Sequence, residues 1–298
     1  MVDLTVLASG STNPTADRFG SAFLLSVDGQ HLMFDCGPSA TSQLVRAGVR
    51  PTEVDYLFFT HHHYDHDVDY PCFLLCRWDQ GAGLERPLTV RGPTLTERFT
   101  DQLIGVGGAF EHDWRARTEN PMSLSAFVAR GGSLPRRPPS ADALDVGPGL
   151  VVGHGSWEVH AAPAVHAQPW LDSLAYRFES PAGSVVFTGD TEPCDSVVDL
   201  ARGADVLVSM CYDDEERMER SGVAGGQSGP RRSAGMAAAA GVGTLVLVHQ
   251  TPNVARPEEA ARAVELTADC FGGTVIFAEQ LQRIEVERTR QPVSDGDR

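Results

Sequence analysis

The sequence contains no lysine at any of its 298 positions, and all 24 of its basic residues are arginine. A lysine Schiff base and a lysine-dependent phosphate-binding loop are therefore excluded. Acidic residues number 40, which gives a formal net charge of −16 at pH 7. Because nucleic-acid binding depends on a basic surface that displaces counterions, this charge argues against a nucleic-acid partner and favours a small-molecule substrate.

Long apolar runs are absent as well. Nowhere do about 18 apolar residues follow one another, and the first residues do not combine a basic start with an apolar stretch. The sequence therefore predicts a cytoplasmic protein with no membrane segment, and it leaves a homodimer open. The six cysteines show no disulfide-like framework for a chain of this length, so we interpret them as small buried apolar residues.

The most informative segment that is present runs from Thr60 to His66 and reads Thr-His-His-His-Tyr-Asp-His, directly after the apolar run 54–59. A histidine run can be a solvated loop or an expression tag, but this one is internal and follows a strand-like segment. His61 and His63 are two residues apart, so in an extended segment they project together. They are candidate ligands of one metal ion, and we give His62 no ligand role.

Asp65 and His66 begin an expected helix that extends to about Trp78, from which they can turn toward a second ion. Imidazole and carboxylate ligands together favour zinc, and manganese or iron fits the same ligands. The spacing therefore suits a pair of ions better than a single one.

Further ligands are expected at other strand ends, because a dinuclear site has about eight protein positions and one loop cannot fill them. His166, Asp190 and His249 each follow an apolar, strand-like segment. Any one of them alone could be a turn residue or a buried core residue. Three such strand ends in the same chain favour a shared metal site.

With these residues the sequence resembles the metallo-β-lactamase superfamily, and within it the branch of ribonuclease Z and the arylsulfatase-like hydrolases. The resemblance spans nearly the whole chain, because five separated motifs occur in the order typical of the family. These motifs are Leu7–Ser11, Arg18–Ala22, Phe34–Gly37, Thr60–His66 and Val248–His249.

The resemblance implies a dinuclear site with a defined set of ligands. The first ion is held by His61, His63 and His166, the second by Asp65, His66 and His249, and Asp190 bridges the two. Asp35 then resembles the outer carboxylate that orients the histidine loop by hydrogen bonds. Asp65 and Asp190 are the side chains expected to orient the attacking water.

One departure from the family concerns the proton donor. Ribonuclease Z-like members carry a further histidine, followed by Ser or Thr, before the last helix, and this chain has Gln227 there. An amide can hydrogen-bond an oxyanion but cannot deliver a proton at neutral pH. An aromatic or otherwise stable leaving group best accommodates that change.

Strand-like and helix-like segments alternate twice along the chain, which predicts an αββα sandwich of two facing mixed β-sheets with helices outside. We expect one domain over residues 1–298 with a loose tail at 291–298. The Gly- and Pro-rich stretch 105–149 is expected to be a lid or insertion, or else disordered. The expected substrate contacts are Phe110 and Trp114 in that stretch, together with Trp170, Tyr212 and Gln227.

The sequence therefore predicts a metal-dependent hydrolase of a small ester-like substrate: a phosphodiester, sulfate ester, lactone or carboxylic ester. In such a site a water held between two zinc ions becomes the nucleophile. The alternatives are a tRNA 3′ endonuclease, a hydrolytic dehalogenase of an activated aromatic, a di-iron redox enzyme and a metal-stabilised binding protein without turnover.

Overall fold

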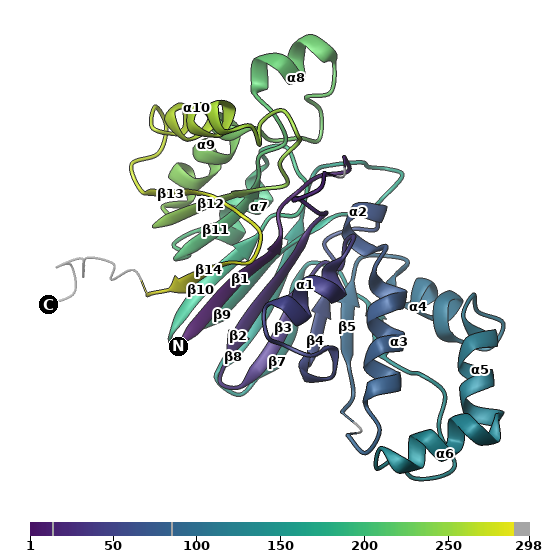
Figure 1. The fold of residues 1–298 in the computed structure, drawn as a ribbon. Coiled ribbons are helices and arrows are strands. Elements are labelled where there is room, and N and C mark those ends of the chain that lie inside the picture. The colour runs from purple at the N-terminus through teal and green to yellow at the C-terminus, as the bar shows by residue number, and fades with distance from the viewer. Residues whose placement is uncertain (14, 85, 289–298) are drawn as a thin grey trace, which may run out of the picture.

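The chain folds into two seven-stranded β-sheets that pack face to face, with helices on their outer surfaces (Figure 1). The computed structural model describes residues 1–13, 15–84 and 86–288, so the expected tail at 291–298 lies outside the described residues. The arrangement confirms the αββα sandwich that the sequence predicts.

The first sheet joins the N-terminal half of the chain to its last strand. In spatial order it contains β14 (Gln282–Val286), β1 (Val2–Ala8), β2 (Ala22–Val27), β3 (Gln30–Phe34), β4 (Tyr56–Phe58), β5 (Thr89–Gly92) and β6 (Asp142–Asp145). Pairing is antiparallel from β14 to β3 and parallel from β3 to β6. The sheet is therefore mixed, and the pairing of β14 with β1 places the first and last described strands side by side.

The second sheet is built entirely from the C-terminal half. In spatial order it contains β13 (Thr274–Phe277), β12 (Thr244–Val248), β11 (Val206–Met210), β10 (Gly183–Phe187), β9 (Leu174–Ser180), β8 (Trp157–Pro163) and β7 (Gly149–His154). Strands β10 to β13 are parallel and β7 to β10 are antiparallel.

Helices flank both sheets. They are α1 (Ala40–Arg46), α2 (Tyr64–Asp67), α3 (Tyr70–Gln80), α4 (Thr96–Ile104), α5 (Glu111–Glu119), α6 (Pro121–Ala129), α7 (Asp195–Ala201), α8 (Glu215–Ser221), α9 (Pro230–Ala240) and α10 (Pro257–Thr267), with a short 3₁₀ helix at Pro51–Glu53. No helix in the described part of the chain has the length and apolar character needed to span a bilayer.

The central core lies between the sheets and contains side chains from both. Phe34 of β3 stacks on Phe187 of β10 with ring centroids 4.0 Å apart, and on Phe58 of β4 at 5.0 Å. Outer cores hold α1 and α3 against the first sheet, and α7, α9 and α10 against the second. Because β4, β8, β10 and β12 are fixed by these cores, the loops that follow them have defined positions.

One expectation for local structure is wrong. The helix expected from Asp65 to Trp78 is divided into α2 and α3, with Pro71 in the first turn of α3. Proline suits the first turn of a helix but lacks the N–H that a helix interior needs. A new helix, α3, therefore begins at Tyr70, with Pro71 in its first turn.

The stretch 105–149 is ordered, because it contains α5, α6 and β6. Figure 1 shows α6 beyond the C-terminal end of α3, whereas α2 lies at the other end. Carboxylate oxygens of Asp79 in α3 lie 3.4 Å, 3.2 Å and 2.8 Å from Arg117, Arg130 and Arg136. These ion pairs fix the stretch to the end of α3 remote from the histidine loop.

Candidate metal centre

Three imidazoles converge on one point at the ends of β4 and β8. The Nε2 atom of His61 lies 3.0 Å from Nδ1 of His63, which lies 3.1 Å from Nε2 of His166. The outer Nδ1 atom of His61 faces the Thr60 hydroxyl at 3.0 Å, and that of His166 faces the Gly226 carbonyl at 2.8 Å. With the outer nitrogens donating those bonds, the inner lone pairs face each other, which suits a shared cation.

A second group lies directly beside the first. Asp65 and His66 come from α2, and His249 follows β12; one ligand atom from each lies within 4.8 Å of the others. The His249 Nε2 atom is 3.1 Å from Oδ2 of Asp65. The two groups therefore occupy adjacent positions at one rim of the sandwich.

Asp190 stands between the two groups. Its Oδ1 atom is 3.4 Å from Nε2 of His66, and its Oδ2 atom is 3.0 Å from Nε2 of His249 and 3.7 Å from Nε2 of His166. The preceding Gly189 has a φ of 59°, and a Cβ there would lie 2.7 Å from that of Thr60. Glycine is thus required for the close approach that delivers Asp190 to both groups.

Asp35 supports the histidine loop from behind. Its Oδ2 atom accepts a 2.7 Å hydrogen bond from Nδ1 of His66, and its Oδ1 atom accepts a 2.7 Å bond from the Thr60 backbone N–H. Asp35 and His249 are both non-glycine residues with positive φ, 61° and 57°. Such backbone conformations are costly and cluster at functional sites, where the surrounding structure maintains them.

The protonation equilibria of the cluster follow from burial and mutual contact. Burial and the neighbouring His66 hold the pKa of His61 well below its ordinary value. Burial raises the pKa of Asp190, but His249 and His66 outweigh burial and hold that pKa well below its ordinary value. Burial lowers the pKa of His249, yet Asp190 and Asp65 raise it to about 9. The site therefore favours ionised carboxylates beside imidazoles, an environment that a divalent cation stabilises.

Several buried atoms of the cluster also lack a conventional partner. Asp65 Oδ1, His66 Nε2 and Asp190 Oδ1 have no hydrogen-bond partner within the described residues. Buried polar atoms are normally satisfied, and those left over require an explanation such as a bound ion. The donor set of nitrogen and carboxylate oxygen fits one or two divalent cations.

The expected substrate residues fall into two sets. Trp170 is 90% exposed in the loop just after His166. Tyr212 lies with its ring centroid 6.0 Å from that of His249. Gln227 follows Gly226, and its Oε1 atom is buried with no hydrogen-bond partner within the described residues. These three residues therefore lie beside the candidate ligands in sequence or in space.

Phe110 and Trp114 do not join them. Trp114 is 5% exposed within α5, and Phe110 lies in the turn between α4 and α5. Neither makes a hydrogen bond or ring contact to a candidate ligand in the described structure. Their segment packs around the remote end of α3, so the structure does not bring these two residues to the candidate metal centre.

Sequence reasoning missed two supporting groups. The Thr60 hydroxyl is 2.9 Å from Oδ2 of Asp35 and 3.0 Å from Nδ1 of His61, so it links the two metal-ligand groups. The Gly226 carbonyl orients His166 from a distant loop. The sequence could have indicated the Thr60 hydroxyl, because this threonine directly precedes the histidine run. A backbone carbonyl leaves no sequence signal.

Comparison with known proteins agrees with this architecture. A family model described as "Beta-lactamase superfamily domain" matches residues 30–250. A protein named ribonuclease Z from Mycolicibacterium paratuberculosis is 30% identical over 294 residues, which cover 96% of this chain and 99% of the relative.

Two solved structures share the fold over almost their full length. The metallo-β-lactamase fold protein YhfI from Bacillus subtilis has a TM-score of 0.68 at 19% identity, with 95% of this chain and 98% of that chain covered. The short form of human tRNase Z has a TM-score of 0.66 at 22% identity, with 95% and 99% covered.

The sandwich and its rim of histidines and aspartates define a metallo-β-lactamase-type hydrolase. The chain belongs to the metallo-β-lactamase superfamily, and curated relatives that match it over nearly their whole length are named ribonuclease Z.

Proposed function

We propose that this protein is a two-zinc phosphodiesterase that cleaves RNA. The observation that carries the proposal is the convergence of six side chains into two adjacent groups with Asp190 between them. Two adjacent cations are suited to phosphoryl chemistry because they can contact both the attacking and the leaving oxygen of an in-line displacement.

The residues divide between the ions as the geometry groups them. The first zinc is assigned to His61, His63 and His166, the second to Asp65, His66 and His249, and both to Asp190. When bound, the pair would lower the pKa of a water molecule between them and polarise the scissile phosphate. Manganese or iron could occupy the same ligands.

The protein's own groups then position the reactants. Asp190 and Asp65 accept hydrogen bonds and orient the attacking water, while Asp35 and Thr60 fix the imidazole rings behind them. Gln227 can donate from its amide nitrogen to a phosphate oxygen but has no proton to give at neutral pH. The leaving oxygen therefore takes its proton from solvent.

RNA is favoured over a small ester because the full-length relatives are named ribonuclease Z. The net charge of −16, taken alone, favours a small substrate, so the names of the relatives favour a different substrate class from the one that the charge favours. Trp170 offers a recognition route that does not need a basic surface. A 90% exposed indole beside His166 provides a stacking platform for a base.

A second candidate is hydrolysis of a small phosphodiester or ester with a good leaving group. Gln227 favours it, because an enzyme without a histidine donor acts best on groups that depart unprotonated. The two candidates share one metal centre and differ in the leaving group.

The zinc-loaded protein should be assayed on a tRNA precursor with a 3′ extension, on an unstructured RNA of equal length and on bis(p-nitrophenyl) phosphate. We expect RNA cleavage that a chelator abolishes and zinc restores, and that His61→Ala abolishes. Cleavage of bis(p-nitrophenyl) phosphate without cleavage of either RNA would select the second candidate. A fully loaded protein that cleaves none of the three would overturn the assignment.

A further inference from the structure

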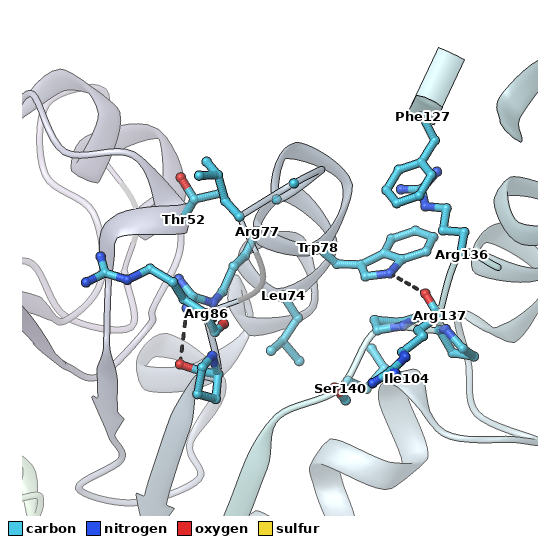
Figure 2. A pocket seen from close by; sticks show the side chains of 16 residues that line it. Thr52, Leu74, Arg77, Trp78, Arg86, Ile104, Phe127, Arg136, Arg137 and Ser140 are labelled. Carbon is cyan, nitrogen blue, oxygen red and sulfur yellow. Dashed lines mark hydrogen bonds between the residues drawn. The ribbon is translucent and has the colours of Figure 1, made fainter. Parts of the chain in front are cut away.

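A cavity of about 310 Å³ lies between the C-terminal half of α3, α6 and residues 136–140 (Figure 2). No candidate metal ligand lines it. Asp65 and His66 precede the N-terminal end of α3, and the eight helical rises from Tyr70 to Trp78 span about 12 Å. The cavity is therefore separate from the metal centre.

The charge of this cavity is opposite to that of the chain. Arg77, Arg86, Arg136 and Arg137 line it, and none of the described lining residues is acidic. Arg136 pairs with Asp79 at 2.8 Å and Arg86 lies 3.8 Å from Asp55, so the positive charge without a carboxylate partner in the described structure comes from Arg77 and Arg137. These two cations favour an anionic ligand over a neutral or cationic one.

Arg136 is positioned by aromatic rings and still has bonding capacity. Its guanidinium lies 4.0 Å from the Trp78 ring centroid and 4.7 Å from that of Phe127, and Figure 2 shows it between the two side chains. One of its nitrogens contacts Asp79 at 2.8 Å. Arg136 is only 6% exposed, and its buried Nε atom has no hydrogen-bond partner within the described residues.

Two further arginines lack a carboxylate partner. Arg77 is 8% exposed and donates to the carbonyl oxygens of Pro51, Arg86 and Pro87, but forms no ion pair in the described structure. Burial lowers its pKa to about 10. Arg137 is exposed, and its side chain has neither a hydrogen bond nor an ion pair with any described residue.

Apolar side chains form another part of the lining, beside the polar Thr52 and Ser140. Leu74, Ile104 and Phe127 are each less than a tenth exposed and line the same cavity. A ligand must therefore combine an anionic group with a flat or apolar body. The volume lies at the small end of the range for ligand pockets, which suits one nucleotide better than a larger molecule.

We propose that this cavity binds a nucleoside monophosphate unit, with the phosphate held by the exposed Arg137 and the base packed beside Trp78, Leu74 and Ile104. Arginine pairs strongly with phosphate, and guanidinium planes and aromatic rings pack against bases. The proposal goes beyond the RNA-cleaving function and does not depend on it, because the two sites share no residue.

The test is calorimetric titration of adenosine 5′-monophosphate (AMP) into the wild type and two charge-reversed variants. Arg137→Glu removes the exposed cation at the cavity. Arg98→Glu is the matched control, because Arg98 is also exposed and also lacks a side-chain contact among the described residues. Adenosine and inorganic phosphate are titrated separately, and a chelator is present throughout.

We expect AMP to bind the wild type and Arg98→Glu equally, and Arg137→Glu about tenfold or more weakly. Adenosine alone and phosphate alone should each bind more weakly than AMP. Asp190→Ala should keep the wild-type affinity, which separates this site from the metal centre. The proposal is overturned if AMP does not bind the wild type at about 1 mM, if the two arginine variants behave alike, or if Asp190→Ala loses binding.

A short single-stranded oligoadenylate identifies where the nucleotide comes from. If the oligomer displaces AMP and Arg137→Glu raises KM for RNA without changing kcat, the cavity holds part of an RNA substrate. If the oligomer does not compete and AMP alters kcat, the cavity holds a free nucleotide. Both results require that AMP occupies the cavity. If the oligomer displaced AMP equally from Arg137→Glu and from the wild type, the proposed site would be wrong.

Discussion

Thr60 connects the two halves of the candidate metal centre with a single hydroxyl. It lies 2.9 Å from Asp35, which orients His66, and 3.0 Å from Nδ1 of His61. Thr60→Val keeps the shape but removes these bonds, so both rings lose their fixed orientation. Loss of such supporting bonds costs about 10- to 100-fold in metal affinity. Competition with a chromogenic zinc chelator measures the change.

Thr60→Ser is the control for that substitution, because it retains the hydroxyl and loses only a methyl group. It should bind zinc nearly as tightly as the wild type. Equal affinities for Thr60→Val and Thr60→Ser would show that the hydroxyl does not orient the ligands.

Gln227 sets the leaving-group preference in this account. Gln227→His introduces a group that titrates near neutral pH and can protonate a departing oxygen. The rate should therefore rise more for alkyl or ribose leaving groups than for p-nitrophenol. A series of phosphodiesters of increasing leaving-group pKa measures this as a flatter dependence of rate on pKa. A uniform change across the series would contradict the role assigned to Gln227.

At the scale of elements, α3 connects the histidine loop to α5 and α6 through Asp79. Burial raises the pKa of Asp79, but Arg130 and Arg136 outweigh burial and lower it from 3.8 to about 2. A depressed carboxyl pKa stabilises the folded state above the unfolded value, and this contribution is lost as pH falls through the folded value. The stabilising effect of Asp79 should therefore decline between about pH 4 and pH 2.

Asp79→Asn tests the contribution of these ion pairs to stability. After allowance for solvent screening we expect it to lower the free energy of unfolding by about 1 kcal/mol at pH 7, and by less at pH 3. Urea unfolding at both pH values measures the difference. Asp101→Asn, at an exposed carboxylate of α4 without a side-chain hydrogen bond among the described residues, should have little effect at either pH. Equal destabilisation by Asp79→Asn at both pH values would contradict the ion-pair explanation.

These elements also show what the sequence can reveal. His61, His166, Asp190 and His249 each follow a strand that is rich in apolar residues or alternates between buried and exposed ones. Those patterns predicted both the fold and the candidate ligands. The helices α5 and α6 were missed because their placement depends on partners in α3. The stacking of Arg136 on Trp78 joins residues 58 positions apart, which no local pattern reveals.

For the whole molecule, the inter-sheet core unites residues from both ends of the described chain, from Val2 to Val286. We propose that the described chain unfolds as one unit, because neither sheet can bury its inner face alone. Circular dichroism and tryptophan fluorescence should report one coincident thermal transition. Trp157 probes the central core and Trp114 probes α5. A separate early transition of Trp114 would show that the region around α5 and α6 folds independently.

The central claim is that the two sheets bring distant loops to one rim to hold paired cations. Anomalous diffraction at the zinc edge from crystals of the zinc-loaded protein tests it most directly. We predict two peaks about 3.5 to 4 Å apart, one among His61, His63 and His166 and the other among Asp65, His66 and His249, with Asp190 touching both. A single peak, or peaks remote from Asp190, would contradict the account.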